Sequence, residues 1–288
     1  MAGLKILIAG AGGQLGWELQ RTAPAEVDVL AADKRQLNLL QPDQVCELIH
    51  REQPDWIINA AAYTAVDKAE DEADIAYAIN RDGARLLATC AAELGAQMLH
   101  ISTDFVFNGQ KGTPYLVDDQ PGPLGVYGAS KQAGDEVVET ALGGRCAIIR
   151  TAWVYSAHGN NFVKTMLRLM TERDQLGIVA DQIGSPTWAN GLARASWRAV
   201  QLNLSGMHHW TDMGVASWYD FAVAIQEEAL AIGVLRKPCV ISPLRTADYP
   251  TPAARPAYSV LDKTPTLQAL GLQAVHWRQA LREMLAEL

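Results

Sequence analysis

The chain has 288 residues, of which 49% are apolar and 19% charged, enough to bury a sizeable core in one large domain or two modest ones. Its 24 Lys and Arg residues against 32 Asp and Glu give a net charge of −8 with no basic run, which disfavours nucleic-acid binding. No apolar run approaches the ~20 residues that a bilayer span needs, and the N-terminus lacks a signal-peptide layout, so we expect a cytoplasmic protein with no membrane partner.

The first half of the chain alternates between short apolar runs and helix-like stretches. The continuous apolar runs predict buried strands, at Lys5–Ala9, Asp28–Ala32, Trp56–Asn59, Gln97–Ser102 and Arg145–Thr151. Helices are predicted between them, over Gln14–Ala23, Pro42–Glu52, Asp71–Leu94 and Tyr127–Ala141. This alternation predicts an α/β fold, a Rossmann-like doubly wound parallel sheet over residues 1–155.

The pattern changes in residues 156–288, where helical stretches alternate with loops rich in Gly, Pro and Asp. The expected helices are Asn161–Arg173, Thr187–Leu202, Ser217–Ala231 and His276–Leu288, and the loops are Asp181–Pro186, Ser242–Pro256 and Asp262–Thr266. We expect a smaller C-terminal substrate-binding region over the carboxyl edge of the sheet, where open α/β sheets bind ligands. The run Met207–Trp210 can return to the sheet, so residues 205–231 need not all belong to this region.

The first strand leads into a glycine-rich turn, Gly10-Ala-Gly-Gly13-Gln14-Leu15-Gly16, at the start of a helix. Free N–H groups and the helix dipole favour a phosphate there, and glycine lets the backbone approach it closely. Asp33 lies 20 residues beyond Gly13, where a carboxylate can hydrogen-bond a ribose hydroxyl. Lys34 and Arg35 would attract a 2′-phosphate that Asp33 repels, so the sequence predicts a dinucleotide and leaves NADPH or NADH open.

The third predicted strand ends in a run of alanines, Asn59-Ala-Ala61-Ala62-Tyr63-Thr64. Small side chains at this edge leave room for a ligand to lie across the backbone. Close packing of a helix on the strand explains the alanines equally well, so spacing alone does not decide between the two.

Candidate catalytic groups follow the next strand and open the next helix. Thr103 and Asp104 fall at the ligand-binding edge, and 24 residues after Thr103 come Tyr127 and Lys131, spaced i,i+4 on one helix face. A close ammonium stabilises a phenolate, so we expect Lys131 to lower the pKa of Tyr127, and Lys131 can also reach the ribose of a nicotinamide cofactor. Tyr127 is then the proton donor to a carbonyl oxygen.

Taken together, these motifs resemble those of the extended short-chain dehydrogenase/reductases. The resembling segments span most of the chain: Gly10–Glu18, Asn59–Glu70, Ser102–Phe107, Val126–Lys131, Arg150–Tyr155, Gly159–Arg168, Asp181–Thr187 and Tyr249–Pro256. The chain departs from the pattern at three positions. Asn38 stands where family members often carry aspartate, Phe105 where tyrosine is frequent, and Tyr63 where some members carry histidine. None of the three belongs to the expected catalytic triad.

The resemblance implies a Thr103–Tyr127–Lys131 triad and NADPH- or NADH-dependent reduction of the C4 ketone of a nucleotide sugar, dTDP-4-dehydro-L-rhamnose. The cofactor contacts that it implies are Gly10, Gly13, Gln14, Leu15, Asp33, Asn38, Leu39, Ala61, Ala62, Tyr63, Thr64, Tyr127 and Lys131. The implied substrate contacts are Thr103, Asp104, Trp153 and Arg255. Trp153 would offer a flat apolar surface, and Arg255 would bind a diphosphate.

Metal and thiol chemistry are not expected. The family resemblance is compatible with a homodimer, but Trp188–Gly191 lacks the glutamate through which some members bind magnesium, so no metal is expected. The histidines show no zinc-ligand spacing. The four cysteines, Cys46, Cys90, Cys146 and Cys239, form no Cys-x-x-Cys motif and are expected to be buried free thiols.

Two alternative functions stay open. One is another nucleotide-sugar 4-ketoreductase or epimerase of the same family, and the other is a non-catalytic regulatory subunit that binds the cofactor. Phe105 follows Asp104 where dehydratases carry a second acid, which disfavours dehydration. The intact triad disfavours a regulatory subunit.

Overall fold

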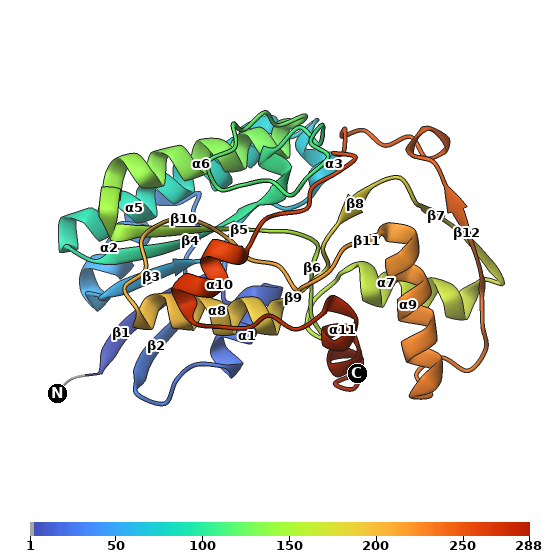
Figure 1. The fold of residues 1–288 in the computed structure, drawn as a ribbon. Helices are drawn as coiled ribbons and strands as arrows, with labels where there is room; N and C mark the ends of the chain where they lie inside the picture. Colours follow the sequence, from blue (N-terminus) through green and yellow to red (C-terminus); the bar gives the residue numbers. More distant parts are fainter. Residues whose placement is uncertain (1–2) are drawn as a thin grey trace.

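Six parallel strands form the larger part of the structure, a computed structural model that describes residues 3–288 (Figure 1). The strand order is β10-β5-β4-β3-β1-β2. The bounds are β1 Leu4–Ala9, β2 Val27–Ala32, β3 Trp56–Asn59, β4 Gln97–Thr103, β5 Cys146–Thr151 and β10 Gly206–His209. Because β1 lies between β2 and β3, the strand order reverses there, and a doubly wound sheet binds its ligand at such a point. The predicted fold class is confirmed.

Helices cover both faces of this sheet, as Figure 1 shows. One layer holds α2 (Pro42–Glu52), α5 (Ala84–Leu94) and α6 (Val126–Leu142), and the other holds α1 (Gln14–Arg21), α8 (Ala189–Gln201) and α10 (Thr264–Leu270). Alternate residues of β1 enter opposite layers: Leu7 packs with the first, and Ile6 and Ile8 pack with the second. Burial on both faces explains why the strands read as continuous apolar runs.

Part of the chain's second half belongs to this sheet. Residues 206–209 form β10, which pairs parallel with β5, and α8 packs against α1. The helix α9 (Trp218–Ala231) lies in residues 205–231, the stretch that can return to the sheet, but it packs in the second region instead.

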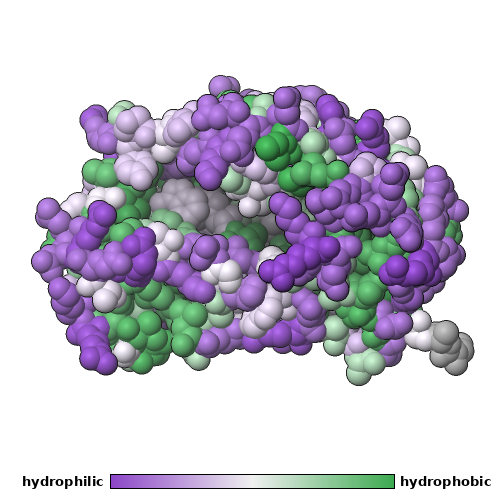
Figure 2. Space-filling model, turned by 180° about the vertical axis from the view of Figure 1, so that it is seen from behind, coloured by the Kyte–Doolittle hydropathy of each residue, from purple (hydrophilic) through white to green (hydrophobic). Residues whose placement is uncertain are grey.

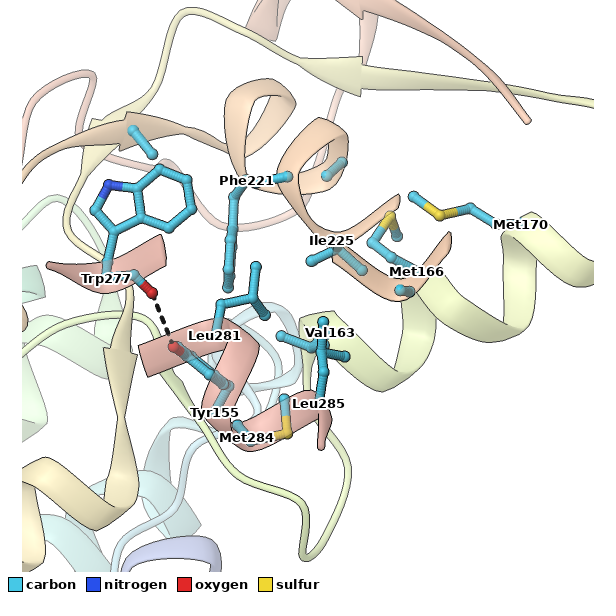
Figure 3. Packing of buried hydrophobic residues seen from close by; sticks show 14 of the residues in the cluster. Tyr155, Val163, Met166, Met170, Phe221, Ile225, Trp277, Leu281, Met284 and Leu285 are labelled. Carbon is cyan, nitrogen blue, oxygen red and sulfur yellow. Dashed lines mark hydrogen bonds between the residues drawn. The ribbon is translucent and has the colours of Figure 1, made fainter. Parts of the chain in front are cut away.

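A second region packs around its own apolar cluster. Its helices are α7 (Phe162–Glu172), α9 and α11 (Trp277–Leu285), joined by the parallel pair β7 (Gln175–Val179) and β12 (Val240–Leu244). Figure 3 shows their side chains converging on Phe221, and the Tyr155 hydroxyl donating to the Trp277 carbonyl at 3.4 Å. The shorter elements are α3 Val66–Ala69, β6 Val154–Tyr155, β8 Ile183–Gly184, β9 Thr187–Trp188 and β11 Ala216–Ser217.

Three expectations about local structure were wrong. The predicted helix over Asp71–Leu94 is divided into α4 (Ala73–Tyr77), a π-helical turn η1 (Ala78–Gly83) and α5. At the end of η1, a Cβ on Gly83 would lie 2.8 Å from the Leu39 side chain, so the helix approaches the neighbouring loop too closely for any larger residue. The strand β7 was not predicted, and residues expected to be loop form parts of β12 and α10.

Neither a bilayer-spanning helix nor a disulfide occurs within residues 3–288. All four thiols are free, and three of them are buried. The exception is Cys46, which is partly exposed on α2.

Candidate active site

Three neighbouring hollows lie along the carboxyl ends of the sheet strands. A central hollow of about 540 Å³ contains the expected triad, and it shares Gly13, Ala62 and Thr64 with a hollow of about 560 Å³ beside the second strand. It shares Trp218 and Arg255 with a third hollow of about 470 Å³ in the second region. Figure 2 shows the molecule hollowed near the middle of one face, with hydrophilic residues around the rim. The three hollows together form an extended site.

The glycine-rich turn between β1 and α1 has the geometry of a phosphate cradle. Gly10 has φ +86°, and a Cβ there would lie 2.7 Å from the Ala61 nitrogen. A Cβ on Gly16 would lie 2.2 Å from the Gly10 carbonyl oxygen, so both positions require glycine. No side chain caps α1, which leaves its first N–H groups available to an anion. Gln14 and Leu15, the first residues of the helix, line the central hollow.

Charged and polar residues after β2 line the hollow beside this turn. Asp33 Oδ1 accepts the backbone N–H groups of Arg35 at 2.8 Å and Gln36 at 3.2 Å, which fixes the carboxylate beside the hollow. Lys34 and Arg35 are exposed and also line it. Asn38 and Leu39 form the next part of its wall. Acidic and basic groups therefore face the same space.

The run after β3 forms the floor between the first two hollows. Ala61, Ala62, Tyr63 and Thr64 line the hollow beside the second strand, and Ala62 and Thr64 also line the central hollow. Asn80 of η1 holds this run, because its Oδ1 accepts from the Tyr63 nitrogen at 2.8 Å and its Nδ2 donates to the Tyr63 carbonyl at 3.1 Å. The Tyr63 phenol donates to Glu72 at 2.6 Å.

The three expected triad residues all line the central hollow. Thr103 ends β4, and its hydroxyl donates to Asp104 Oδ1 at 3.1 Å and accepts from the Phe105 nitrogen at 3.2 Å. Tyr127 and Lys131 come from the first turns of α6, whose N-terminus faces the same edge. The Lys131 ammonium donates to the Ile101 carbonyl at 2.6 Å.

The expected lowering of the Tyr127 pKa is wrong. Burial raises the pKa of Tyr127 to about 12, against a lowering contribution from Thr103 and with a further rise from Asp104 and Asp135. Lys131 does not offset this, because its ammonium is turned toward β4 and contacts Ile101 and His100. Burial also lowers the pKa of Lys131 to about 8, and Asp135 opposes that change. The phenol is therefore protonated at neutral pH.

Asp104 is the acidic group at the centre of this site. It is 2% exposed, and its Oδ2 oxygen has no hydrogen-bond partner among residues 3–288. Burial raises the pKa of Asp104 to about 6, while the nearby hydroxyls of Ser259 and Thr103 lower it. Asp104 is also one of the residues that line the central hollow.

The two remaining expected substrate residues lie toward the third hollow. Trp153 adopts φ +49° and stacks on Trp218 with ring centroids 3.5 Å apart, while Gly184 covers the indole from another side. Trp218 therefore covers part of the indole, and Trp153 still lines the central hollow. The Arg255 guanidinium donates to Asp67 at 2.8 Å and to Thr251 at 2.5 Å. It lines both the central and the third hollow.

A buried polar cluster that the sequence did not predict lies beneath the triad. Its members come from four elements and are Asn59, His100, Ser102, Asp135 and Arg150. Asp135 could have been found, because it lies i+4 from Lys131 on the same face of α6. The others depend on the register that aligns β3, β4 and β5, which pairs Asn59 with His100 and Ser102 with Arg150.

Comparison with known proteins places this geometry in context. Residues 4–288 match the family model described as RmlD substrate binding domain. A dTDP-4-dehydrorhamnose reductase of Aggregatibacter actinomycetemcomitans is 43% identical over 98% of both chains. The crystal structure of the Bacillus anthracis dTDP-4-dehydrorhamnose reductase in complex with NADP has a TM-score of 0.93 and 38% identity, covering 99% of this chain and 100% of that one. The corresponding Clostridium acetobutylicum structure also has a TM-score of 0.93 and 38% identity, covering 98% and 99%.

Proposed function

The chain belongs to the dTDP-4-dehydrorhamnose reductase family, and from that premise we propose that it reduces the C4 ketone of dTDP-4-dehydro-L-rhamnose to dTDP-L-rhamnose with NADPH or NADH. One observation carries the assignment of its site. Thr103, Tyr127 and Lys131 line a single hollow that is continuous with the glycine-rich turn. A proton donor and a cofactor cradle therefore border the same space.

The residues around the first two hollows fit a dinucleotide. The uncapped N-terminus of α1 suits the pyrophosphate, and the hollow lined by Asp33, Lys34 and Arg35 suits the adenosine end. Ala61, Ala62, Tyr63 and Thr64 would pass beneath the cofactor, with Asn38 and Leu39 beside the adenine. When bound, the nicotinamide supplies the hydride that reduces the ketone.

Tyr127 is proposed to donate the proton that the reduced C4 oxygen needs. Its raised pKa keeps the phenol protonated at neutral pH, and an alkoxide oxygen is more basic than a phenolate, so the transfer is favourable. The Thr103 hydroxyl is proposed to orient the ketone oxygen. With the cofactor bound, the Lys131 ammonium would turn from the Ile101 carbonyl to bind the cofactor ribose and stabilise the phenolate left behind.

The third hollow is proposed to hold the nucleotide part of the substrate. Arg255 lies where the central and third hollows meet, which suits a diphosphate between sugar and base. Asp67 already pairs with this guanidinium at 2.8 Å, so a diphosphate would share or displace that carboxylate. Trp153 is proposed to limit the sugar position with the part of its ring left free by Trp218, and Asp104 to accept a sugar hydroxyl.

The reaction is tested by mixing the protein with NADPH or NADH and freshly made dTDP-4-dehydro-L-rhamnose. The expected result is loss of the reduced-nicotinamide absorbance in equal amount to the dTDP-L-rhamnose formed, identified by chromatography. Cofactor binding without turnover of this ketone would overturn the proposed substrate. Turnover of another 4-keto sugar nucleotide would then favour a different 4-ketoreductase, and turnover of none would favour the regulatory subunit.

A further inference from the structure

A buried carboxylate lies one helical turn beyond the lysine of the triad. Asp135 is 3% exposed and Lys131 is 2% exposed, and both come from α6. Asp135 Oδ2 accepts from the Ser102 hydroxyl at 2.8 Å and from Arg150 Nε at 3.4 Å. Its other oxygen, Oδ1, has no hydrogen-bond partner among residues 3–288. A carboxylate placed here is costly to bury unless nearby cations compensate it.

An imidazole lies between this carboxylate and the lysine. His100 Nε2 is 3.3 Å from Lys131 Nζ and 3.6 Å from Asp135 Oδ1. Asn59 Oδ1 accepts the Ala61 N–H at 3.1 Å, so its amide NH₂ faces His100 Nδ1 at 3.0 Å and assigns the ring proton to Nε2. A protonated Lys131 cannot accept that N–H, and Asp135 Oδ1 lies 3.6 Å from it, beyond hydrogen-bond distance, so the carboxylate acts on the cluster through its charge.

We propose that Asp135 is a positioning residue for the reduction, and that its buried carboxylate, one turn further along α6, keeps the Lys131 ammonium charged and in place. This inference rests on the proposed function. Arg150 holds the carboxylate from the opposite side, and Gly134 lets the helix lie close, since a Cβ there would be 2.2 Å from the Asn80 carbonyl oxygen and 3.6 Å from His100 Nε2.

The charges around this cluster give the sign of the expected effect. The titratable or charged groups that face it are His100 from β4, Asp104 from the short helical turn after β4, Arg150 from β5, and Tyr127, Lys131 and Asp135 from α6. Asp135 raises the pKa of Lys131 and that of Tyr127. His100 is neutral, because burial and Lys131 hold its pKa well below the usual value. Reduction needs the Lys131 ammonium charged and the Tyr127 phenol protonated. Loss of the Asp135 charge lowers both pKa values, so both groups lose their protons at lower pH and the activity declines earlier.

The test is the pH profile of kcat for Asp135→Asn. The high-pH decline is expected to move about one unit lower, the size typical of losing a neighbouring charge, while KM for the sugar nucleotide stays within about threefold. A merely structural role would lower kcat equally at every pH and leave the decline where it is. If Asp135→Asn folds and binds NADPH but its high-pH decline in kcat does not move, the proposal is overturned.

A matched control comes from the same helix. Glu136 is exposed, its carboxylate accepts from Gln132 Nε2 at 2.9 Å, and Glu136→Gln removes the same charge one residue further on. Its pH profile is expected to match that of the unaltered protein. If that protein itself does not reduce the ketone, the proposed function fails. If the unaltered protein reduces the ketone and only the pH shift expected of Asp135→Asn is missing, this inference alone fails.

A second variant covers the case in which Asp135→Asn does not fold, because Arg150 would lose its buried partner. His100→Gln keeps the charges of Lys131 and Asp135 and removes the imidazole ring that lies between Lys131 Nζ and Asp135 Oδ1. Direct approach of ammonium and carboxylate, and less burial of Nζ, both raise the pKa of Lys131, so the decline is expected to stay or move to higher pH. A move to lower pH by about half a unit would overturn the proposal.

Discussion

The indole rings of Trp153 and Trp218 stack 3.5 Å apart between centroids, with their planes 7° from parallel. Trp153 lies between β5 and β6 with φ +49°, a conformation that a large side chain adopts only when its surroundings hold it there. Trp218 opens α9, whose start is fixed by a capping box between Ser217 and Asp220. Through this stack, the position of α9 in the second region helps to fix where Trp153 lies in the central hollow.

Trp218→Leu is expected to raise KM for the sugar nucleotide about tenfold and to change kcat by less than about threefold. The stack is an aromatic pair worth about 1 kcal/mol, and its loss frees Trp153 to leave its strained position. Steady-state kinetics measure the change in KM and kcat. The dissociation constant of NADPH serves as a control and should not change. A decrease in kcat as large as the increase in KM would show instead that the site itself had collapsed.

Gly184→Ala tests the same indole from another direction. A Cβ at Gly184 would lie 2.7 Å from Cε2 of Trp153, so the ring has to move while the stack partner remains. We expect an increase in KM of about the same size as in Trp218→Leu, since the displaced pair is the same. Gly112→Ala is the control, because a Cβ there meets nothing within 4 Å. Unchanged KM in Gly184→Ala would mean that the indole position does not affect substrate binding.

Tyr127→Phe is expected to lower kcat about a hundredfold or more, because general acid catalysis contributes at least that much. NADPH binding should remain within about threefold, since the phenol oxygen is a single contact. Tyr77→Phe removes the same oxygen from α4, outside the three hollows, and should leave turnover about unchanged. Near-normal turnover by Tyr127→Phe would exclude the phenol as the proton donor.

Replacing both Lys34 and Arg35 by Ala is expected to raise KM for NADPH about tenfold and to leave KM for NADH within about twofold. Only the phosphorylated cofactor presents the 2′-phosphate that these exposed cations can bond, at about 1.5 kcal/mol for a charge-assisted contact. Lys237→Ala, which removes an exposed cation paired with Asp174, is the control. A parallel increase for both cofactors would indicate that the substitutions disturb the loop, not a phosphate contact.

The order of strands and helices was predictable because each element carries its own local pattern, a continuous apolar run for a buried strand or a helix-like stretch between two such runs. The i,i+4 spacing of Tyr127 and Lys131 likewise placed both residues on one face of α6 before any contact was known. Spacing did not give the direction of the Lys131 ammonium, which depends on the Ile101 carbonyl and His100 of a different strand. The predicted pKa effect on Tyr127 failed for that reason.

Contacts between distant segments account for the other differences. The Trp153–Trp218 stack needs two regions of the chain to meet, and neither tryptophan has a local pattern that reveals its partner. The division of the Asp71–Leu94 helix depends on Asn80 turning toward Tyr63 and on Leu39 packing against Gly83. The strands β7 and β12 are short and partly exposed, so their apolar pattern is too weak to predict.

Glu228 provides a prediction about stability at low pH. This side chain is 7% exposed on α9, and its oxygens accept from Arg282 at 2.7 and 2.9 Å and from Arg278 at 2.7 Å on α11. These arginines lower the pKa of Glu228 from 4.5 to about 2. Because the folded pKa is below the unfolded value, the stabilisation is complete above about pH 4.5 and is lost as the pH falls toward 2.

Glu228→Gln is therefore expected to lower the free energy of unfolding by about 2 kcal/mol at neutral pH, discounted for the partial exposure of both arginines. The difference from the unaltered protein should shrink toward zero as the pH approaches 2, and urea unfolding at several pH values measures it. The neighbouring Glu227→Gln is the control, since Glu227 also contacts Arg278 but is 53% exposed and should contribute little. A deficit in Glu228→Gln that does not depend on pH would show that the carboxylate stabilises α9 and α11 by packing and not by its charge.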